Sequence, residues 1–68
     1  MTLGKMGARE YKDLREELGL SQAQLARTLG IHTLTVSKRE RGVHKVKPEA
    51  ALALRMLEID QKYGLGYK

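Results

Sequence analysis

The chain has 68 residues, contains no cysteine and carries a formal net charge of +5 at pH 7. This length suits a single small domain, the lack of cysteine excludes disulfides and thiolate metal sites, and the basic excess favours a polyanionic partner. No apolar run reaches the roughly 20 residues of a membrane span, and the first residues lack the apolar stretch of a signal peptide, so we expect a cytoplasmic protein.

The first predicted helix runs from about Ala8 to Leu18, after a short N-terminal arm of residues 1–7. Its apolar residues recur at spacings of three and four, which places them on one face of a helix. That face consists of Tyr11, Leu14 and Leu18. Gly19 follows at the position where a left-handed residue commonly ends a helix. Arg15 lies at the border of the buried face.

A second helix is predicted over Gln22–Leu29. Ser21 is a good N-cap, and Gln24 stands three residues later, which is the spacing of a capping box. The side of this helix that we expect to be buried carries Leu25, Ala26 and Leu29. Gly30 then supplies a turn with positive φ, which glycine adopts without a side-chain clash.

The third predicted helix, from about Thr33 to Arg41, carries apolar residues on opposing faces. Leu34 and Val36 lie about 200° apart on a helix of 100° per residue, so only one of them faces the core. We take Val36 as the inward residue. The outer face then carries Leu34, Ser37, Lys38 and Arg41, with Thr33 projecting at the helix start. An exposed leucine on this face suggests contact with another molecule, and we interpret the helix as one that lies in a DNA groove.

The positive charge is concentrated on this helix and the loop after it. Five basic residues and one acidic residue lie between His32 and Lys47, so four of the five net positive charges fall within 16 residues. The alternative is a merely solvated charged face. Because the excess coincides with the helix that exposes Leu34, we favour a nucleic-acid partner.

The last predicted helix begins at Pro48, whose missing amide hydrogen is no loss in a first helical turn. The run AALALRMLEI is apolar almost all round, which exceeds what one small core can bury. The surplus continues into the C-terminal tail, residues 63–68. A dimer interface is therefore expected at Met56, Ile59, Tyr63, Leu65 and Tyr67. The sequence predicts an all-α fold, with one domain over residues 8–62.

Three stretches of the chain read LREELGLSQAQLA, LGI and TVSKRERG. Together they resemble the helix-turn-helix repressors of the Cro and phage-repressor type, the Xre family. The resemblance covers Leu14 to about Leu57. It implies a compact bundle of four to five helices with the motif at residues 21–42, which binds double-stranded DNA in the major groove. It also implies a largely buried ion pair between Arg15 and Glu40, and Glu40 does fall only about 40° from Val36 on the helix.

The same resemblance assigns roles on the DNA side. It implies that four positions face base edges, namely Thr33, Leu34, Ser37 and Lys38. It also implies that Gln22 anchors a phosphate at the start of its helix, with a simple capping role as the alternative. Arg39 departs from the family pattern of an apolar or aromatic residue, and we expect its stem to pack inward while its head reaches solvent or phosphate. The expected phosphate contacts are Ser21, Gln22, Arg39, Arg41, His44, Lys45 and Lys47.

These features favour a transcriptional regulator, most simply a homodimeric repressor of a palindromic operator. We expect this repressor to be nucleoid-associated when it is bound to DNA and to control its own operon. Two alternatives stay open: an antitoxin-like module that binds an unidentified protein and binds DNA secondarily, and a non-specific coat for nucleic acid. His32 and His44 stand twelve residues apart without a third ligand nearby, so we expect no metal site. We expect no cofactor, and no nucleophile and base arrangement suggests an enzyme.

Overall fold

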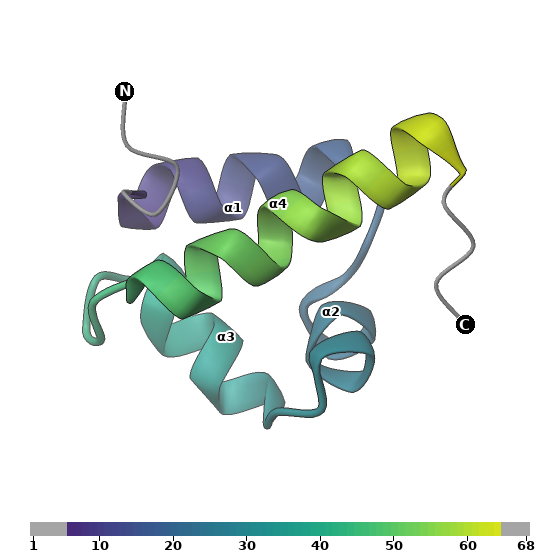
Figure 1. The fold of residues 1–68 in the computed structure, drawn as a ribbon. Coiled ribbons are helices and arrows are strands. Elements are labelled where there is room, and N and C mark those ends of the chain that lie inside the picture. Colours follow the sequence, from purple (N-terminus) through teal and green to yellow (C-terminus); the bar gives the residue numbers. More distant parts are fainter. Residues whose placement is uncertain (1–5, 65–68) are drawn as a thin grey trace.

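A computed structural model describes residues 6–64 of the chain. These residues form four helices and no strand: α1 (Ala8–Glu17), α2 (Gln22–Leu29), α3 (Thr33–Glu40) and α4 (Pro48–Tyr63). α1 packs against α3 and α4, and α2 packs against α3 (Figure 1). The predicted all-α helix-turn-helix fold is confirmed. None of these helices has the length and apolar character needed to span a bilayer.

Local signals in the sequence place the helix ends almost to the residue. α1 ends at Glu17, one residue before its expected end, because Leu18 serves as the C-cap. The capping box at α2 is complete, since the Gln24 amide donates to Ser21 Oγ at 3.1 Å and the Ser21 amide donates to Gln24 Oε1 at 2.8 Å. Gly30 ends α2 in the left-handed region, with φ +70°. α3 ends at Glu40 and has Arg41 as its C-cap.

The core is built from one face of each helix. Its largest fully buried side chains are Tyr11, Leu25, Val36 and Leu54, one from each helix in turn. Their burial confirms the inward faces predicted for the first three helices, including the choice of Val36 over Leu34. Met6, which the sequence places in the N-terminal arm, is also buried in this core.

α4 begins at Pro48 as predicted and continues through Tyr63, which lies in the helix rather than in a tail. Two contacts hold it to α1. Arg55 pairs with Glu10 at 3.2 Å, and the Gln61 side-chain amide donates to the Leu18 carbonyl at 3.0 Å. The side of α4 away from the core exposes several large apolar residues. Leu65 and Tyr67, which we expected at a dimer interface, lie outside the described residues.

Candidate nucleic-acid interface

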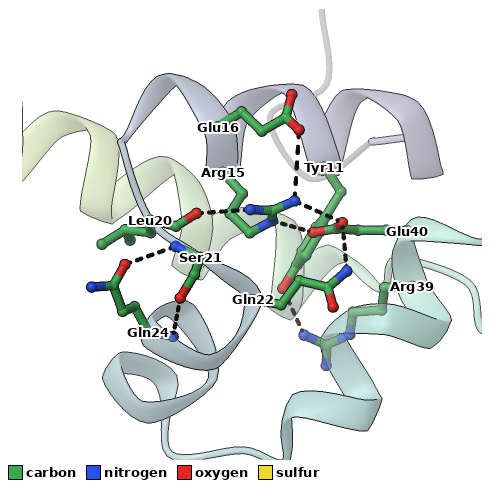
Figure 2. A network of polar contacts seen from close by, with 9 residues as sticks. All are labelled: Tyr11, Arg15, Glu16, Leu20, Ser21, Gln22, Gln24, Arg39 and Glu40. Carbon is green, nitrogen blue, oxygen red and sulfur yellow. Dashed lines mark hydrogen bonds and ion pairs between the residues drawn. The ribbon is translucent and has the colours of Figure 1, made fainter.

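A buried ion pair between α1 and the end of α3 supports the helix-turn-helix motif. The Arg15 guanidinium donates from Nε to Glu40 Oε2 at 2.6 Å and from Nη2 to Glu40 Oε1 at 3.2 Å (Figure 2). Its Nη1 donates to the Leu20 carbonyl at 2.7 Å. The Glu40 side chain is only 3% exposed, so this charge depends on its partner. The hydrogen bond to Glu40 raises the pKa of Arg15 and outweighs desolvation, which lowers it, so the guanidinium stays charged.

Gln22 joins this ion pair, a contact that the sequence did not indicate. Its side-chain Nε2 donates to Glu40 Oε1 at 3.0 Å (Figure 2). Because Gln22 is the first residue of α2, the Glu40 carboxylate ties together the ends of three helices: α1, α2 and α3. The Ser21 hydroxyl is likewise occupied by its capping bond. Both side chains at the start of α2 are therefore held by the protein itself.

The outer face of α3 exposes the residues that the sequence assigned to bases. Leu34 is 57% exposed, whereas Val36 two residues later is fully buried. Thr33 is exposed, and Ser37 and Lys38 are partly exposed. Arg41, one turn beyond Ser37, donates from Nε to the Ser37 hydroxyl at 3.2 Å. α3 thus presents an uncharged apolar residue at the centre of a polar and basic face.

A shallow hollow lies beside this face at the start of α3. It is lined by His32, Thr33, Leu34, Thr35, Lys38 and His44. His32 is the N-cap of α3, and His44 belongs to the following loop, so the structure brings together two histidines that are twelve residues apart. Within residues 6–64, no cluster of three or more His, Cys, Asp or Glu side chains is suited to a metal. Sequence reasoning missed His32 and Thr35 as site residues, although His32 immediately precedes the exposed face.

A second hollow, of about 420 Å³, carries positive side chains and no carboxylate. It is lined by Thr35, Arg39, Val43, His44, Lys45 and Lys47. The loop is bound back onto α3, because the amides of Val43 and His44 both donate to the Lys38 carbonyl, at 2.9 and 3.2 Å. This places the loop's cations beside the outer face of α3, where they would attract an anion.

Arg39 is less free than the sequence suggested. Its Nη1 donates to the Tyr11 hydroxyl at 3.1 Å, and its guanidinium carbon lies 5.7 Å from the centre of the Tyr11 ring (Figure 2). The head is therefore held partly by the protein and does not simply extend into solvent. The physical reason is that the Tyr11 ring fills the core while its hydroxyl ends beside α3.

The opposite side of α3 has a different electrostatic character. A hollow between α1 and the end of α3 is lined by Ala8 and by cations and carboxylates together, namely Arg9, Lys12, Asp13, Glu16, Glu40 and Arg41. Some of these charges are already paired, as in the contact of 3.5 Å between Arg9 and Asp13. An anion would meet carboxylates here, so the favourable surface runs from the start of α3 to the loop before α4.

Comparison with known proteins agrees with this arrangement. Residues 12–60 match a family described as helix-turn-helix, and this range includes α2, α3 and most of α1 and α4. No curated protein and no solved structure matches the chain.

Proposed function

The chain belongs to the helix-turn-helix family of the Xre/Cro type, a family of DNA-binding regulators, and from this premise we propose that it is a sequence-specific repressor acting as a homodimer. The observation that carries the proposal is the division of α3 into two faces. Val36 is fully buried while Leu34 is 57% exposed at the centre of a face flanked by cations. This combination suits a helix that enters the major groove of duplex DNA.

The reading face offers a mixture of apolar and hydrogen-bonding groups. Lys38 is suited to donate to guanine O6 and N7, and Leu34 and the Thr33 methyl group suit the methyl group of thymine. Ser37 supplies a hydroxyl, and its bond with Arg41 orients it. In this proposal, Thr33, Leu34, Ser37 and Lys38 determine which bases are preferred.

Phosphate contacts are assigned to the cationic side of the face and to the start of α2. The loop contributes His44, Lys45 and Lys47, all exposed, while Arg39 comes from α3 and Arg41 is its C-cap. At α2, Ser21 and Gln22 are engaged by side-chain bonds, so the backbone amides of the first turn are the better donors to a phosphate. Such contacts fix the position of the protein without specifying sequence.

A domain of this size covers one half-site, and specificity then requires a second copy about 34 Å along the duplex. We therefore propose a palindromic operator, with repression by occupying a site that the polymerase needs, including one before the protein's own gene. The exposed side of α4 is where the second copy would bind. If this side of α4 bound a different protein instead of a second copy, the chain would correspond to the antitoxin-like module.

The experiment that tests this function is selection of bound duplexes from a random pool. We expect enrichment of a palindrome whose half-sites are about one helical turn apart, which would establish specificity and two-fold symmetry together. Recovery of sequences no different from the starting pool would contradict the proposal. It would favour non-specific coating, for which affinity is equal on random duplexes at matched salt.

Two lysine substitutions separate base reading from phosphate binding. Lys38→Ala is expected to relax the preference at one base step, at a cost of about 1–3 kcal/mol on the preferred sequence. Lys45→Ala should weaken every duplex alike and reduce the salt dependence of binding by about one ion. Titration of preferred and scrambled duplexes at several salt concentrations measures both effects. If the two variants behave identically, the division of roles is wrong.

A further inference from the structure

Tyr11 is a core residue whose only polar side-chain atom meets α3. The residue is 0% exposed, so its ring packs entirely inside the fold. Its hydroxyl accepts a hydrogen bond from Arg39 Nη1 at 3.1 Å (Figure 2). A buried hydroxyl needs a hydrogen-bond partner, and here that partner is a charged side chain from another helix. Because the ring is held by the core, this contact fixes where the Arg39 guanidinium lies.

The rest of the Arg39 guanidinium remains available to an anion. A guanidinium carries several N–H donors, and the contact with Tyr11 uses only one of its nitrogens. Within residues 6–64 no carboxylate pairs with Arg39, and the adjacent Glu40 carboxylate is bound by side chains from α1 and α2. Arg39 is also partly exposed. Its charge is therefore held in position by the protein without being neutralised by it.

The hollow of about 420 Å³ beside Arg39 contains further cations. Lys45 and Lys47 of the loop line it together with Arg39, and no acidic residue lines it. Thr35 adds a hydroxyl on the side of α3. A phosphate group carries several acceptor oxygens, so more than one of these donors can bind it at once. The hollow is therefore suited to a phosphate of a nucleic-acid backbone.

We propose that Tyr11 positions the Arg39 guanidinium so that it binds one phosphate of the DNA backbone together with the loop lysines. Tyr11 does not touch the DNA and acts only through Arg39. This inference rests on the DNA binding proposed above, and it adds to the phosphate contacts a positioning residue from α1. It concerns this chain in particular, because the family pattern has an apolar or aromatic residue at the position of Arg39.

Such positioning raises affinity by reducing the entropy lost on binding. A free arginine side chain samples many rotamers and must be ordered when it binds a phosphate. Ordering one long side chain at an interface lowers affinity about two- to tenfold. The hydrogen bond to Tyr11 orders the Arg39 guanidinium before the DNA arrives, so this loss is avoided.

Tyr11→Phe tests the proposal, because it removes the hydroxyl and keeps the buried ring. We expect its affinity for duplex DNA to fall about two- to tenfold, equally for the selected and for scrambled duplexes. The salt dependence of binding should stay unchanged, since Arg39 keeps its charge, whereas Arg39→Ala should reduce it by about one ion. Fluorescence anisotropy at several salt concentrations measures both quantities, and circular dichroism verifies that each variant is folded.

A double variant separates positioning from a purely structural role of Tyr11. If Tyr11 acts through Arg39, Tyr11→Phe combined with Arg39→Ala should bind no more weakly than Arg39→Ala alone. A further loss in the double variant would show that Tyr11 affects binding by another route and would overturn the proposal. An affinity of Tyr11→Phe equal to that of the unmodified chain would overturn it as well.

Arg39→Lys tests the same contact without altering the core. It keeps the charge, but an ammonium is a point charge that lacks the spread donors of a guanidinium. Affinity should therefore fall about as much as for Tyr11→Phe, with the salt dependence unchanged. An unchanged affinity would show that the charge alone is needed, which would contradict positioning.

Two controls account for the chemistry of these substitutions. Tyr63→Phe removes an exposed hydroxyl, keeps its ring and should leave affinity unchanged. Arg9→Ala removes one exposed positive charge and should lower affinity less than Arg39→Ala.

Scrambled duplexes report on the positioning even if the selection recovers no preferred sequence, because phosphate contacts are independent of sequence. Absence of a preferred sequence would therefore contradict the proposed function alone, and an unaltered affinity of Tyr11→Phe would contradict the positioning alone. An unmodified chain that binds no duplex at low salt would overturn both.

Discussion

Replacing Arg15 by alanine is expected to destabilise the fold by about 3–5 kcal/mol, because it leaves the Glu40 carboxylate buried without its charged partner. Among residues 6–64, Glu40 would retain only the bond from Gln22, at 3.0 Å. The Leu20 carbonyl, which accepts from Arg15 at 2.7 Å, would also lose its donor. The loss is a large share of the roughly 5–15 kcal/mol by which small domains are stable.

Urea unfolding followed by circular dichroism measures this effect. Arg9→Ala is the matched control, since its pair with Asp13 is exposed on both sides and should contribute less than about 1 kcal/mol. A double variant, Arg15→Met with Glu40→Leu, removes both charges and should recover much of the lost stability. If Arg15→Ala and Arg9→Ala shift the midpoint equally, the ion pair does not stabilise the motif as argued.

Placing a carboxylate at the centre of the reading face is expected to abolish specific DNA binding while leaving the fold intact. Leu34→Glu should reduce affinity for the selected duplex about 100-fold or more, since a like charge brought against the phosphates costs several kcal/mol. Stability should change by less than about 0.5 kcal/mol, because Leu34 is 57% exposed. Fluorescence anisotropy with a labelled duplex measures the affinity, and thermal unfolding measures the stability.

Thr28→Glu is the control for this substitution, since it adds the same charge at an exposed position on α2 instead of α3. It should lower affinity only slightly, through the reduced net charge of the protein. Leu34→Gln adds polarity without charge and should have an intermediate effect. Equal losses for Leu34→Glu and Thr28→Glu would show that α3 does not lie against the DNA.

Local chemistry explains why the elements could be predicted from the sequence. The capping box of Ser21 and Gln24, the positive φ of Gly30 and the start of α4 at Pro48 each depend on residues within a few positions of one another. Helical angles show that Leu34 and Val36 cannot both face the core, and the complete burial of Val36 confirms that Val36 is the inward residue. The same angles placed Glu40 near the inward face.

Contacts between distant residues decided how the site is supported. The bond from Gln22 to Glu40 joins residues 18 positions apart, and that from Arg39 to Tyr11 joins residues 28 positions apart. The meeting of His32 and His44 at one hollow depends on the path of the loop back to the Lys38 carbonyl. No periodicity within one helix encodes such contacts, because they depend on how the helices cross.

The sequence by itself therefore determined the four helices and their inward faces, since spacing and capping act within one or two helical turns, and its composition placed the basic excess on α3 and the loop after it. Only the tertiary structure decided that Gln22 adds a bond from α2 to the Glu40 carboxylate, that Tyr11 holds Arg39, and that Leu52 lies on the exposed side of α4. These features depend on packing between helices, which sets the distances between residues far apart in the chain and leaves one side of α4 uncovered.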